Sequence, residues 1–235
     1  NENIDELAVL ESLDSGKPIQ DCVEGDLVET MECISWYAEA IDKVYGQVSP
    51  THNDSMGLII KEPIGVVGTV LPWNFPLLMM AWKVAPALAA GNSLIVKPAE
   101  QTSMSALYLG ALAKEAGLPD GVLNILPGLG EEIGKAIGLH NDIDVVSFTG
   151  STEVGRLFLQ YSAQSNLKQI ILECGGKSPS VVLDDAKNLD DAAENITNAV
   201  FWNMGENCTS NSRLIVHESL KEELVTKIIT QTKTW

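Results

Sequence analysis

The chain has 235 residues, of which 45% are hydrophobic and 20% are charged, and its formal net charge is −17. These values are ordinary for a folded globular protein and exclude intrinsic disorder, a collagen-like chain and a disulfide-rich scaffold. The acidic excess repels phosphate backbones and anionic headgroups, so neither nucleic acid nor a membrane surface is an expected partner. No run of 18 apolar residues is present, which argues against a membrane-spanning helix.

The cysteines and histidines favour free thiols over a metal site. No C-x-x-C pair occurs, and none of the three histidines lies at metal-ligand spacing from a cysteine. We therefore expect no bound metal. A chain of this size does not need disulfide bonds for stability, so we expect free thiols and a reducing, cytoplasmic location. The even number of cysteines leaves disulfide pairing as the alternative.

The first 60 residues are predicted to be mainly helical. Apolar residues recur at helical spacing over 3–14, with Asn3 as the N-cap, and over 25–45. Gly16 and Pro18 end the first helix, and residues 46–56 are polar and rich in turn formers.

From residue 57 onward, short apolar runs alternate with helical stretches. Strands are predicted at 58–60, 64–71, 93–97, 122–126, 145–149 and 169–173, and helices at 76–90, 102–117, 130–138 and 151–164. The five strands from residue 64 onward are separated by four helices, which predicts an α/β fold with a doubly wound parallel sheet. Ligands of such sheets bind at the carboxyl ends of the strands.

A second α/β pattern begins after Gly175 and Gly176. Strands are predicted at 180–183 and 213–216, with helices at 189–204 and 218–231. We therefore expect one domain over 1–173 and the start of a second over 174–235. Two strands and two helices are expected to be too few to bury a core of their own.

Polar residues follow two of the predicted strands, 64–71 and 93–97. Asn74 lies between two prolines and two aromatic residues, which would hold its amide in place to donate to an oxyanion. Lys97 and Glu100 leave a strand together, and a carboxylate there can accept hydrogen bonds from ribose hydroxyls. The alternatives are an Asx turn at Asn74 and a solvated charge pair at Lys97 and Glu100.

Two glycine-containing turns open predicted helices, at Gly128-x-Gly130 and at Gly150-Ser151. The free N–H groups and positive dipole end of a helix can hold a phosphate. The alternatives are a plain strand-to-helix turn in the first case and a serine N-cap in the second.

Glu173 and Cys208 are candidates for acid–base and nucleophilic chemistry. Glu173 ends an apolar strand, and partial burial would raise its pKa and suit it to general-base work. Cys208 follows a predicted helix and is surrounded by polar residues, which suits an activated thiol. A solvated carboxylate and a buried small hydrophobe are the respective alternatives.

Taken together and in this order, the motifs resemble those of the NAD(P)-dependent aldehyde dehydrogenase superfamily. The matching stretches are Pro72-Trp-Asn-Phe-Pro76, Lys97-Pro-Ala-Glu100, Phe148-Thr-Gly-Ser-Thr-Glu-Val-Gly155, Leu172-Glu-Cys-Gly-Gly-Lys-Ser-Pro179 and Gly205-x-x-Cys208. The resemblance implies a Rossmann-like cofactor domain over 1–173 and the beginning of a catalytic domain over 174–235.

The roles that the resemblance implies are specific. Cys208 matches the nucleophile, Glu173 the general base, and Asn74 the oxyanion donor that acts with the Cys208 backbone N–H. Lys97 and Glu100 match contacts to the adenosine ribose. The other implied cofactor contacts are Leu71, Trp73, Gly130, Gly150, Ser151 and Val154. Glu100 favours NAD because its charge would repel a 2′-phosphate, while Lys97 leaves NADP use open.

The resemblance also implies an aldehyde substrate, hydrolysis of a cysteine thioester to a carboxylic acid, and a homodimer or homotetramer in which residues 46–61 bridge subunits. Residues 165–176 are most similar to the branch that oxidises ω-amino or γ-glutamylamino aldehydes. Glu206, Asn211 and Cys174 depart from frequent residues of the family, and Glu206 adds negative charge beside Cys208.

Members of the superfamily are about twice as long, so the chain is expected to be a partial sequence that is inactive alone. Its expected gaps are the first strands of the cofactor domain and most of the catalytic domain. The alternatives are a non-catalytic nucleotide-binding remnant and a semialdehyde dehydrogenase that forms acyl-CoA.

Overall fold

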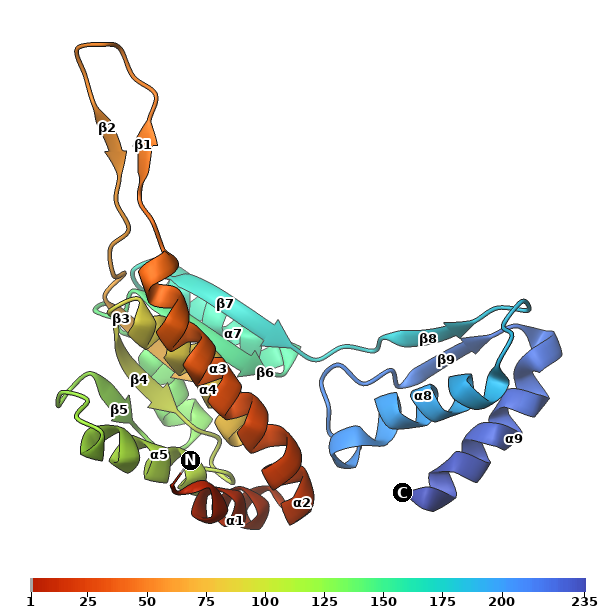
Figure 1. The fold of residues 1–235 in the computed structure, drawn as a ribbon. Helices are drawn as coiled ribbons and strands as arrows, with labels where there is room; N and C mark the ends of the chain where they lie inside the picture. The colour runs from red at the N-terminus through yellow and green to blue at the C-terminus, as the bar shows by residue number, and fades with distance from the viewer. Residues whose placement is uncertain (1) are drawn as a thin grey trace. The chain divides into compact units, whose positions relative to one another are not determined.

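The structure is a computed structural model that describes residues 2–235. The chain divides into two compact units, Asn1–Glu173 and Cys174–Trp235 (Figure 1). Within the described residues, no helix is both long and apolar enough to cross a membrane.

The N-terminal part of the first unit is helical, as the sequence predicts. Its elements are α1 (Ile4–Ser15), α2 (Ile19–Asp21), the π-helix η1 (Cys22–Asp26), α3 (Leu27–Ala40) and the 3-10 helix η2 (Ile41–Lys43). Gly16 ends α1 with φ +74°, and its N–H donates to the Ser12 carbonyl. The second helical stretch therefore begins at residue 19 rather than at 25.

Two details of α1 differ from the prediction. The Asn3 side chain does not cap the helix, because its amide donates to Glu6 and to the Tyr108 hydroxyl instead. The buried face carries Ala8 and Glu11. Leu13, one of the apolar residues at helical spacing over 3–14, is 70% exposed. Helical spacing identified the helix but misplaced part of its buried face.

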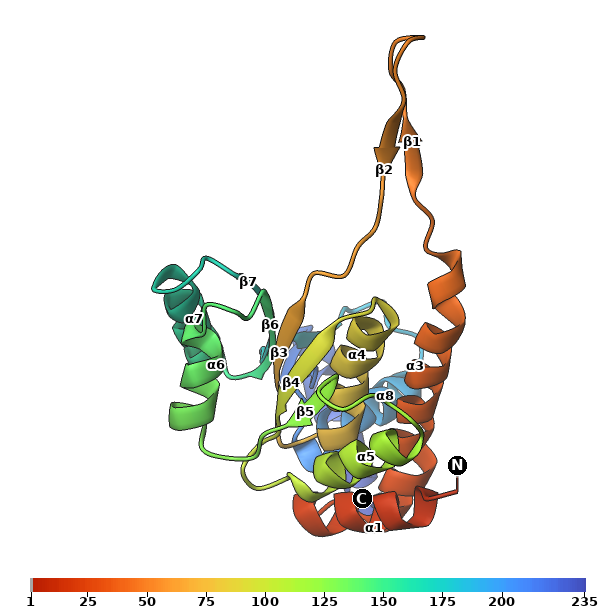
Figure 2. The same cartoon turned by 90° about the vertical axis from the view of Figure 1, so that its left-hand side faces the viewer.

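An antiparallel hairpin of β1 (Gln47–Ser49) and β2 (Gly57–Ile59) forms where the sequence predicts turns and one strand. Figures 1 and 2 show it extending away from the five-stranded sheet. Val48, Met56 and Leu58 are 73%, 78% and 59% exposed. The hairpin therefore leaves apolar side chains uncovered.

The five predicted strands form one sheet. They are β3 (Val66–Val70), β4 (Ser93–Lys97), β5 (Leu123–Ile125), β6 (Val145–Gly150) and β7 (Gln169–Cys174), in the spatial order β5-β4-β3-β6-β7. β3 pairs in parallel with β4 and with β6, and β4 pairs in parallel with β5. The chain runs outward from β3 to β5 and then returns to β6 on the other side, so the topological switch point lies between β3 and β6.

Helices cover this sheet on both faces. They are α4 (Pro76–Ala89), α5 (Met104–Glu115), the π-helix η3 (Gly130–Gly134), α6 (Lys135–Leu139) and α7 (Thr152–Ala163). Figure 2 shows α4 and α5 on one side of the sheet and α6 and α7 on the other. The main core contains Met80 and Val84 of α4 packed against Leu94, Val96 and their neighbours. The single helix predicted over 130–138 is a π-helical turn followed by a short α-helix.

The second unit contains β8 (Pro179–Val182), α8 (Leu189–Phe201), the 3-10 helix η4 (Trp202–Gly205), β9 (Arg213–Val216), the 3-10 helix η5 (Glu218–Leu220), α9 (Lys221–Gln231) and the 3-10 helix η6 (Thr232–Thr234). β8 and β9 pair in parallel.

The second unit buries a small core, so the expectation that it would bury none is wrong. The core consists of Val182, Ala193, Ile196 and Leu224. The register partners Val181 and Ile215 are 57% and 53% exposed. Side chains alternate along a strand, so a single helical layer buries one face of the pair and leaves the other uncovered.

Candidate active site

The loop between β3 and α4 carries the first group of predicted site residues. Leu71 is buried, and its N–H donates to the Lys97 carbonyl at 3.0 Å, which joins the ends of β3 and β4. Trp73 is 41% exposed and Asn74 is half-buried. Phe75 is buried and precedes Pro76, the first residue of α4. The loop is therefore anchored on both sides of Asn74.

Lys97, Glu100 and Gly130 meet at the ends of β4 and β5. The Lys97 ammonium is buried, lies 3.2 Å from Glu100 Oε1 and donates to the Pro98 carbonyl at 2.9 Å. The Gly130 N–H also donates to Glu100 Oε1. The alternative of a fully solvated charge pair is therefore wrong, because one partner is 2% exposed.

Glu100 is held in its charged form. Burial opposes its ionisation, but hydrogen bonds from backbone N–H groups and from Lys97, together with the Lys97 charge, keep the pKa of Glu100 below its ordinary value. The side chain is 40% exposed, so it presents a carboxylate at the carboxyl edge of the sheet.

The turn between β6 and α7 shows the serine N-cap that was the alternative to a phosphate site. Ser151 Oγ accepts from the Val154 N–H at 3.2 Å. Gly150 is required there because a Cβ would lie 2.6 Å from the Phe148 ring. Val154 is 39% exposed, so the first turn of α7 stays accessible at the switch point.

Glu173 lies on β7 and is exposed, so the predicted partial burial is wrong. β7 is an edge strand, and exposed and half-buried residues alternate along it. Glu173 and Ile171 are both among the exposed residues of β7, and both line a pocket of about 420 Å³ beside α4. The carboxylate therefore faces a cavity rather than the protein interior.

The same pocket contains a lysine that we did not select from the sequence. Lys83 of α4 is 8% exposed, and its Nζ donates to Ser147 Oγ at 2.9 Å. Burial lowers its pKa to about 8, while the charge of Glu173 acts in the opposite direction. Thr149 Oγ1 also lines this region and is buried without a hydrogen-bond partner among residues 2–235. A lysine inside the apolar run 76–90 was the signal available in the sequence.

Cys208 lies in the turn that follows η4 and is an exposed free thiol, so the buried alternative is wrong. The predicted helix 189–204 ends earlier, at Phe201. Beyond it, Asn203, Met204 and Gly205 have φ values of +54°, +59° and +75°.

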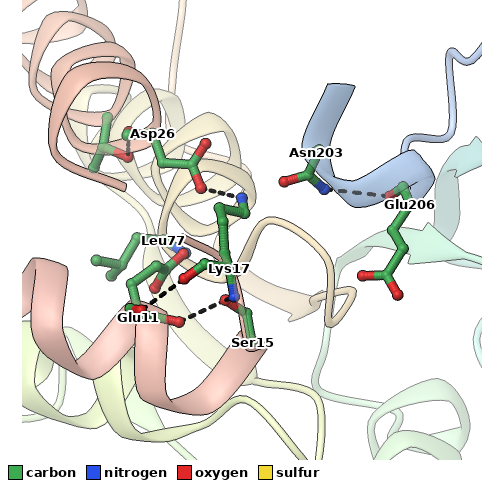
Figure 3. A network of polar contacts seen from close by, with 9 residues as sticks. Glu11, Ser15, Lys17, Asp26, Leu77, Asn203 and Glu206 are labelled. Atoms are coloured by element: carbon green, nitrogen blue, oxygen red, sulfur yellow. Dashed lines mark hydrogen bonds and ion pairs between the residues drawn. The ribbon is translucent and has the colours of Figure 1, made fainter. Parts of the chain in front are cut away.

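Left-handed conformations are costly in this turn, at roughly 1–2 kcal/mol for each non-glycine residue. The Asn203 side chain is buried, and its Nδ2 donates to the Glu206 carbonyl at 3.4 Å (Figure 3). Backbone strain of this kind is concentrated at functional sites, which is consistent with a reactive role for the turn before Cys208.

The candidate catalytic residues are divided between the two units. Asn74 and Glu173 belong to the first unit and Cys208 to the second. Across residues 2–235, no group of three histidine, cysteine or acidic side chains is arranged to hold a metal ion.

An α/β unit with a topological switch point, joined to a segment with an exposed cysteine, has the features of a nucleotide-dependent enzyme. The family model "Aldehyde dehydrogenase family" matches residues 1–235, so the chain belongs to the aldehyde dehydrogenase family.

The chain is 55% identical over 234 residues to an aminoacetaldehyde dehydrogenase of Pseudomonas aeruginosa, covering 100% of this chain and 47% of that protein. A γ-glutamyl-γ-aminobutyraldehyde dehydrogenase structure from Burkholderia cenocepacia has a TM-score of 0.96 at 52% identity, covering 99% of this chain and 47% of the other. An indole-3-acetaldehyde dehydrogenase in complex with NAD+ has a TM-score of 0.97 at 47% identity, covering 100% and 47%. The chain therefore spans about half the length of these relatives.

Proposed function

We propose that the chain is part of an enzyme that oxidises an aldehyde to a carboxylic acid with NAD+. The observation that carries this proposal is the exposed thiol of Cys208, which follows a strained turn in a chain of the aldehyde dehydrogenase family. Exposure lets an aldehyde reach the sulfur, which a structural, buried cysteine would not allow.

Cys208 and Asn74 perform the first step in this proposal. The Cys208 thiolate attacks the aldehyde carbon, forming a carbon–sulfur bond and placing negative charge on the former carbonyl oxygen. The Asn74 amide and the Cys208 backbone N–H donate to that oxyanion. The anchored loop around Asn74 supports this role, because a donor fixed in advance needs no reorganisation during the reaction.

Glu173 performs the second step. Loss of hydride from the tetrahedral adduct leaves a thioester on Cys208. Glu173 removes a proton from water, and the resulting hydroxide attacks the thioester carbon. The carbon–sulfur bond then breaks, which releases the carboxylic acid and leaves the sulfur on Cys208, while the proton stays on Glu173 until it passes to the thiolate or to solvent. The position of Glu173 at a cavity supports this role because water can reach it there.

The residues at the carboxyl edge of the sheet fit NAD. Glu100 presents a carboxylate that can accept from ribose hydroxyls, and α7 begins at the switch point, where the pyrophosphate of a dinucleotide binds in this class of sheet. Lys97 and Glu100 would hold the adenosine ribose. Contacts to the rest of the cofactor would come from Leu71, Trp73, Gly130, Gly150, Ser151 and Val154. When bound, NAD+ supplies the acceptor for the hydride.

NAD is the preferred cofactor in this proposal. The Glu100 charge would repel a 2′-phosphate, and the Lys97 ammonium is already engaged by Glu100 and by the Pro98 carbonyl. A lysine with these partners has little capacity left to neutralise a second anion.

The proposed substrate is an ω-amino or γ-glutamylamino aldehyde. The names of two similar proteins, an aminoacetaldehyde and a γ-glutamyl-γ-aminobutyraldehyde dehydrogenase, support this class. We further propose a homodimer or homotetramer bridged by residues 46–61, which expose the apolar side chains of Val48, Met56, Leu58, Ile59 and Ile60. The cytoplasmic location stays a prediction.

Two other functions compete with this proposal. A nucleotide-binding remnant would bind NAD+ without chemistry, and a CoA-acylating semialdehyde dehydrogenase would resolve the thioester with a thiol instead of water. The presence of Glu173 beside a water-accessible cavity favours hydrolysis.

The test begins with NAD+ titration of the 235-residue chain, followed by an NADH assay with aminoacetaldehyde on the longest polypeptide that carries this sequence. Glu173→Gln is expected to give a burst of about one NADH per site and then to stall, because hydride loss does not need the base whereas hydrolysis does. Binding without any NADH would indicate the remnant. Turnover that requires added CoA would indicate the acylating enzyme.

A further inference from the structure

Three ionisable side chains are buried together beneath the Asn74 loop. Glu11 of α1 is 0% exposed, Lys17 is 1% exposed, and Asp26 of η1 is 4% exposed. Burying an ion costs several kcal/mol unless a partner compensates it. We therefore asked which contacts of these three side chains compensate the cost of their burial.

Lys17 reaches the loop from one side. Its Nζ donates to Asp26 Oδ2 (Figure 3). The same Nζ lies 4.3 Å from the centroid of the Phe75 ring. A cation over an aromatic face is attracted by the ring, and more strongly when water is excluded. The ion pair thus fixes the ring of the residue that directly follows Asn74.

Glu11 reaches the loop from the other side. Its Oε1 accepts from the Leu77 N–H at 3.1 Å, which ties α1 to the first turn of α4 across 66 residues of sequence. Phe75 is the N-cap residue of α4 and makes no side-chain cap bond, and Pro76 at the first helical position has no N–H. Glu11 therefore supplies the acceptor that a serine or aspartate N-cap would provide, at the positive end of the helix.

The cluster contains two carboxyl groups and one ammonium, so its charges cancel only while Glu11 is protonated. Lys17 donates directly to Asp26, whereas Glu11 has the Leu77 N–H and the Ser105 hydroxyl beside it and no ammonium bonded to it among residues 2–235. Burial raises the pKa of Glu11 to about 7, and the Asp26 charge acts in the same direction. Burial therefore disfavours the charged form of Glu11, and the hydrogen bond from the Leu77 N–H acts against this effect.

We propose that Glu11 and Lys17 are positioning residues for the oxyanion donor. Glu11 binds the Leu77 N–H and Lys17 contacts the Phe75 ring, so the chain is held on both sides of Pro76. These two contacts fix the orientation of the neighbouring Asn74 amide. This inference rests on the proposed function, because it assigns Glu11 and Lys17 an effect on chemistry through Asn74. It assigns them no contact with substrate or cofactor.

The first experiment uses the 235-residue chain and measures amide hydrogen exchange by NMR. Glu11→Leu removes the acceptor at similar volume and is expected to speed exchange of the Leu77 N–H at least tenfold. Glu11→Gln keeps an acceptor oxygen and is expected to stay within about threefold of the wild type. Asp5→Leu, which removes an exposed carboxylate from the same helix, is the matched control and should change nothing. Unchanged Leu77 exchange in Glu11→Leu would overturn the inference.

The second experiment is a double-mutant cycle in the longest active polypeptide that carries the sequence. Asn74→Ala is expected to lower kcat by about 10²–10³-fold, the usual loss of one oxyanion donor. Glu11→Leu is expected to lower kcat by about 10–100-fold with little change in KM, since a displacement of about 1 Å has this effect. In the Asn74→Ala background, Glu11→Leu should cost less than about threefold more.

The outcomes separate the two claims. An equal loss of kcat from Glu11→Leu in both backgrounds would show an ordinary structural role and would overturn the positioning inference. Wild-type kcat in Asn74→Ala would overturn the oxyanion role itself, and the positioning inference with it. Rescue by Glu11→Gln at neutral pH supports positioning, since Gln keeps the bond to Leu77.

Discussion

The two units of the chain both contain a parallel sheet, but they stabilise it in different ways. The five-stranded sheet is covered on both faces, and its core joins α4 to β3 and β4. The two-stranded sheet packs one face against α8 and α9 in a core of four buried residues, and it leaves Val181 and Ile215 exposed on the other face. The proposed cofactor residues and oxyanion donor therefore lie on a well-packed framework, whereas the proposed nucleophile lies on a minimal one.

The units also differ in buried charge. Among residues 2–235, every buried charged side chain belongs to the first unit, including Glu11, Lys17, Asp26, Lys83 and Lys97. The buried polar residues of Cys174–Trp235 are the uncharged Thr197, Asn203 and Ser210. Burying a charged group costs free energy unless a partner compensates it, so each of these side chains needs such a partner. In the second unit, the ion pairs of Lys227 with Asp190 and Glu223 lie at the surface instead, and they raise the Lys227 pKa.

The largest expected effect is at the nucleophile. Cys208→Ser should lower turnover by about 10⁴-fold or more in the active polypeptide, because an unactivated hydroxyl cannot replace the thiolate. Cys33→Ser, at a half-buried position of α3, is the matched control and should retain near-wild-type turnover. Steady-state NADH production measures both. Wild-type turnover in Cys208→Ser would show that Cys208 is not the nucleophile.

The next effect tests whether the two cores are independent. Leu94→Ala and Leu224→Ala each delete a fully buried leucine, with an expected cost of about 2–5 kcal/mol. Leu224→Ala should unfold Cys174–Trp235 alone, because four core residues leave little reserve of stability. Hydrogen exchange after urea titration would show loss of protection confined to that unit. Simultaneous unfolding of both units in Leu224→Ala would contradict this comparison.

The smallest expected effect is the pH dependence that the Glu11 cluster gives to the first unit. The folded pKa of Glu11 is raised from 4.5 to about 7, so folding favours its protonated form. Between pH 4.5 and 7 the unfolded chain releases this proton while the folded chain keeps it, so the free energy of unfolding falls as pH rises. The shift corresponds to about 3 kcal/mol.

The charged and titratable groups that face Glu11 are Lys17, Asp26 and Cys22. Asp26 has a pKa raised by burial and adds to the same trend. Glu11→Gln should flatten most of the pH dependence of the first unit, as measured by urea unfolding at pH 5 and pH 7. The second unit should show no matching change over this range, and an equal slope in both units would argue against the assignment to Glu11.

The sequence predicted the elements of the sheet well. β4 and β9 have the bounds that their apolar runs indicated, and the other predicted strands differ by one or two residues at an end, whereas β1 was not predicted. Runs of β-branched residues bounded by glycine or proline specify strands locally, so little tertiary information is needed. The hairpin at 47–59 and the split helix at 130–139 were predicted less well, because polar strands and π-helical turns have weak local signals.

The sequence predicted which residues form the candidate site, but it did not predict the burial or the hydrogen-bond partners of the residues in and around it. Alternation on an edge strand left Glu173 exposed, and no periodicity in the sequence shows which strand forms the edge. Lys83 and Glu11 were not selected, because a lysine or glutamate in a helix is usually solvated. Their burial depends on partners such as Ser147 and Leu77, which are 64 and 66 residues away in the chain.

By itself, the sequence determined the order of strands and helices, the strand-end motifs and the resemblance to a family, because each of these depends on residues that are close together in the chain. Only the tertiary structure decided which ionisable groups are buried, which residue replaces the missing N-cap of α4, and which face of each sheet is covered. Burial and pairing depend on the distances between segments that are remote in sequence, and folding alone brings those segments together.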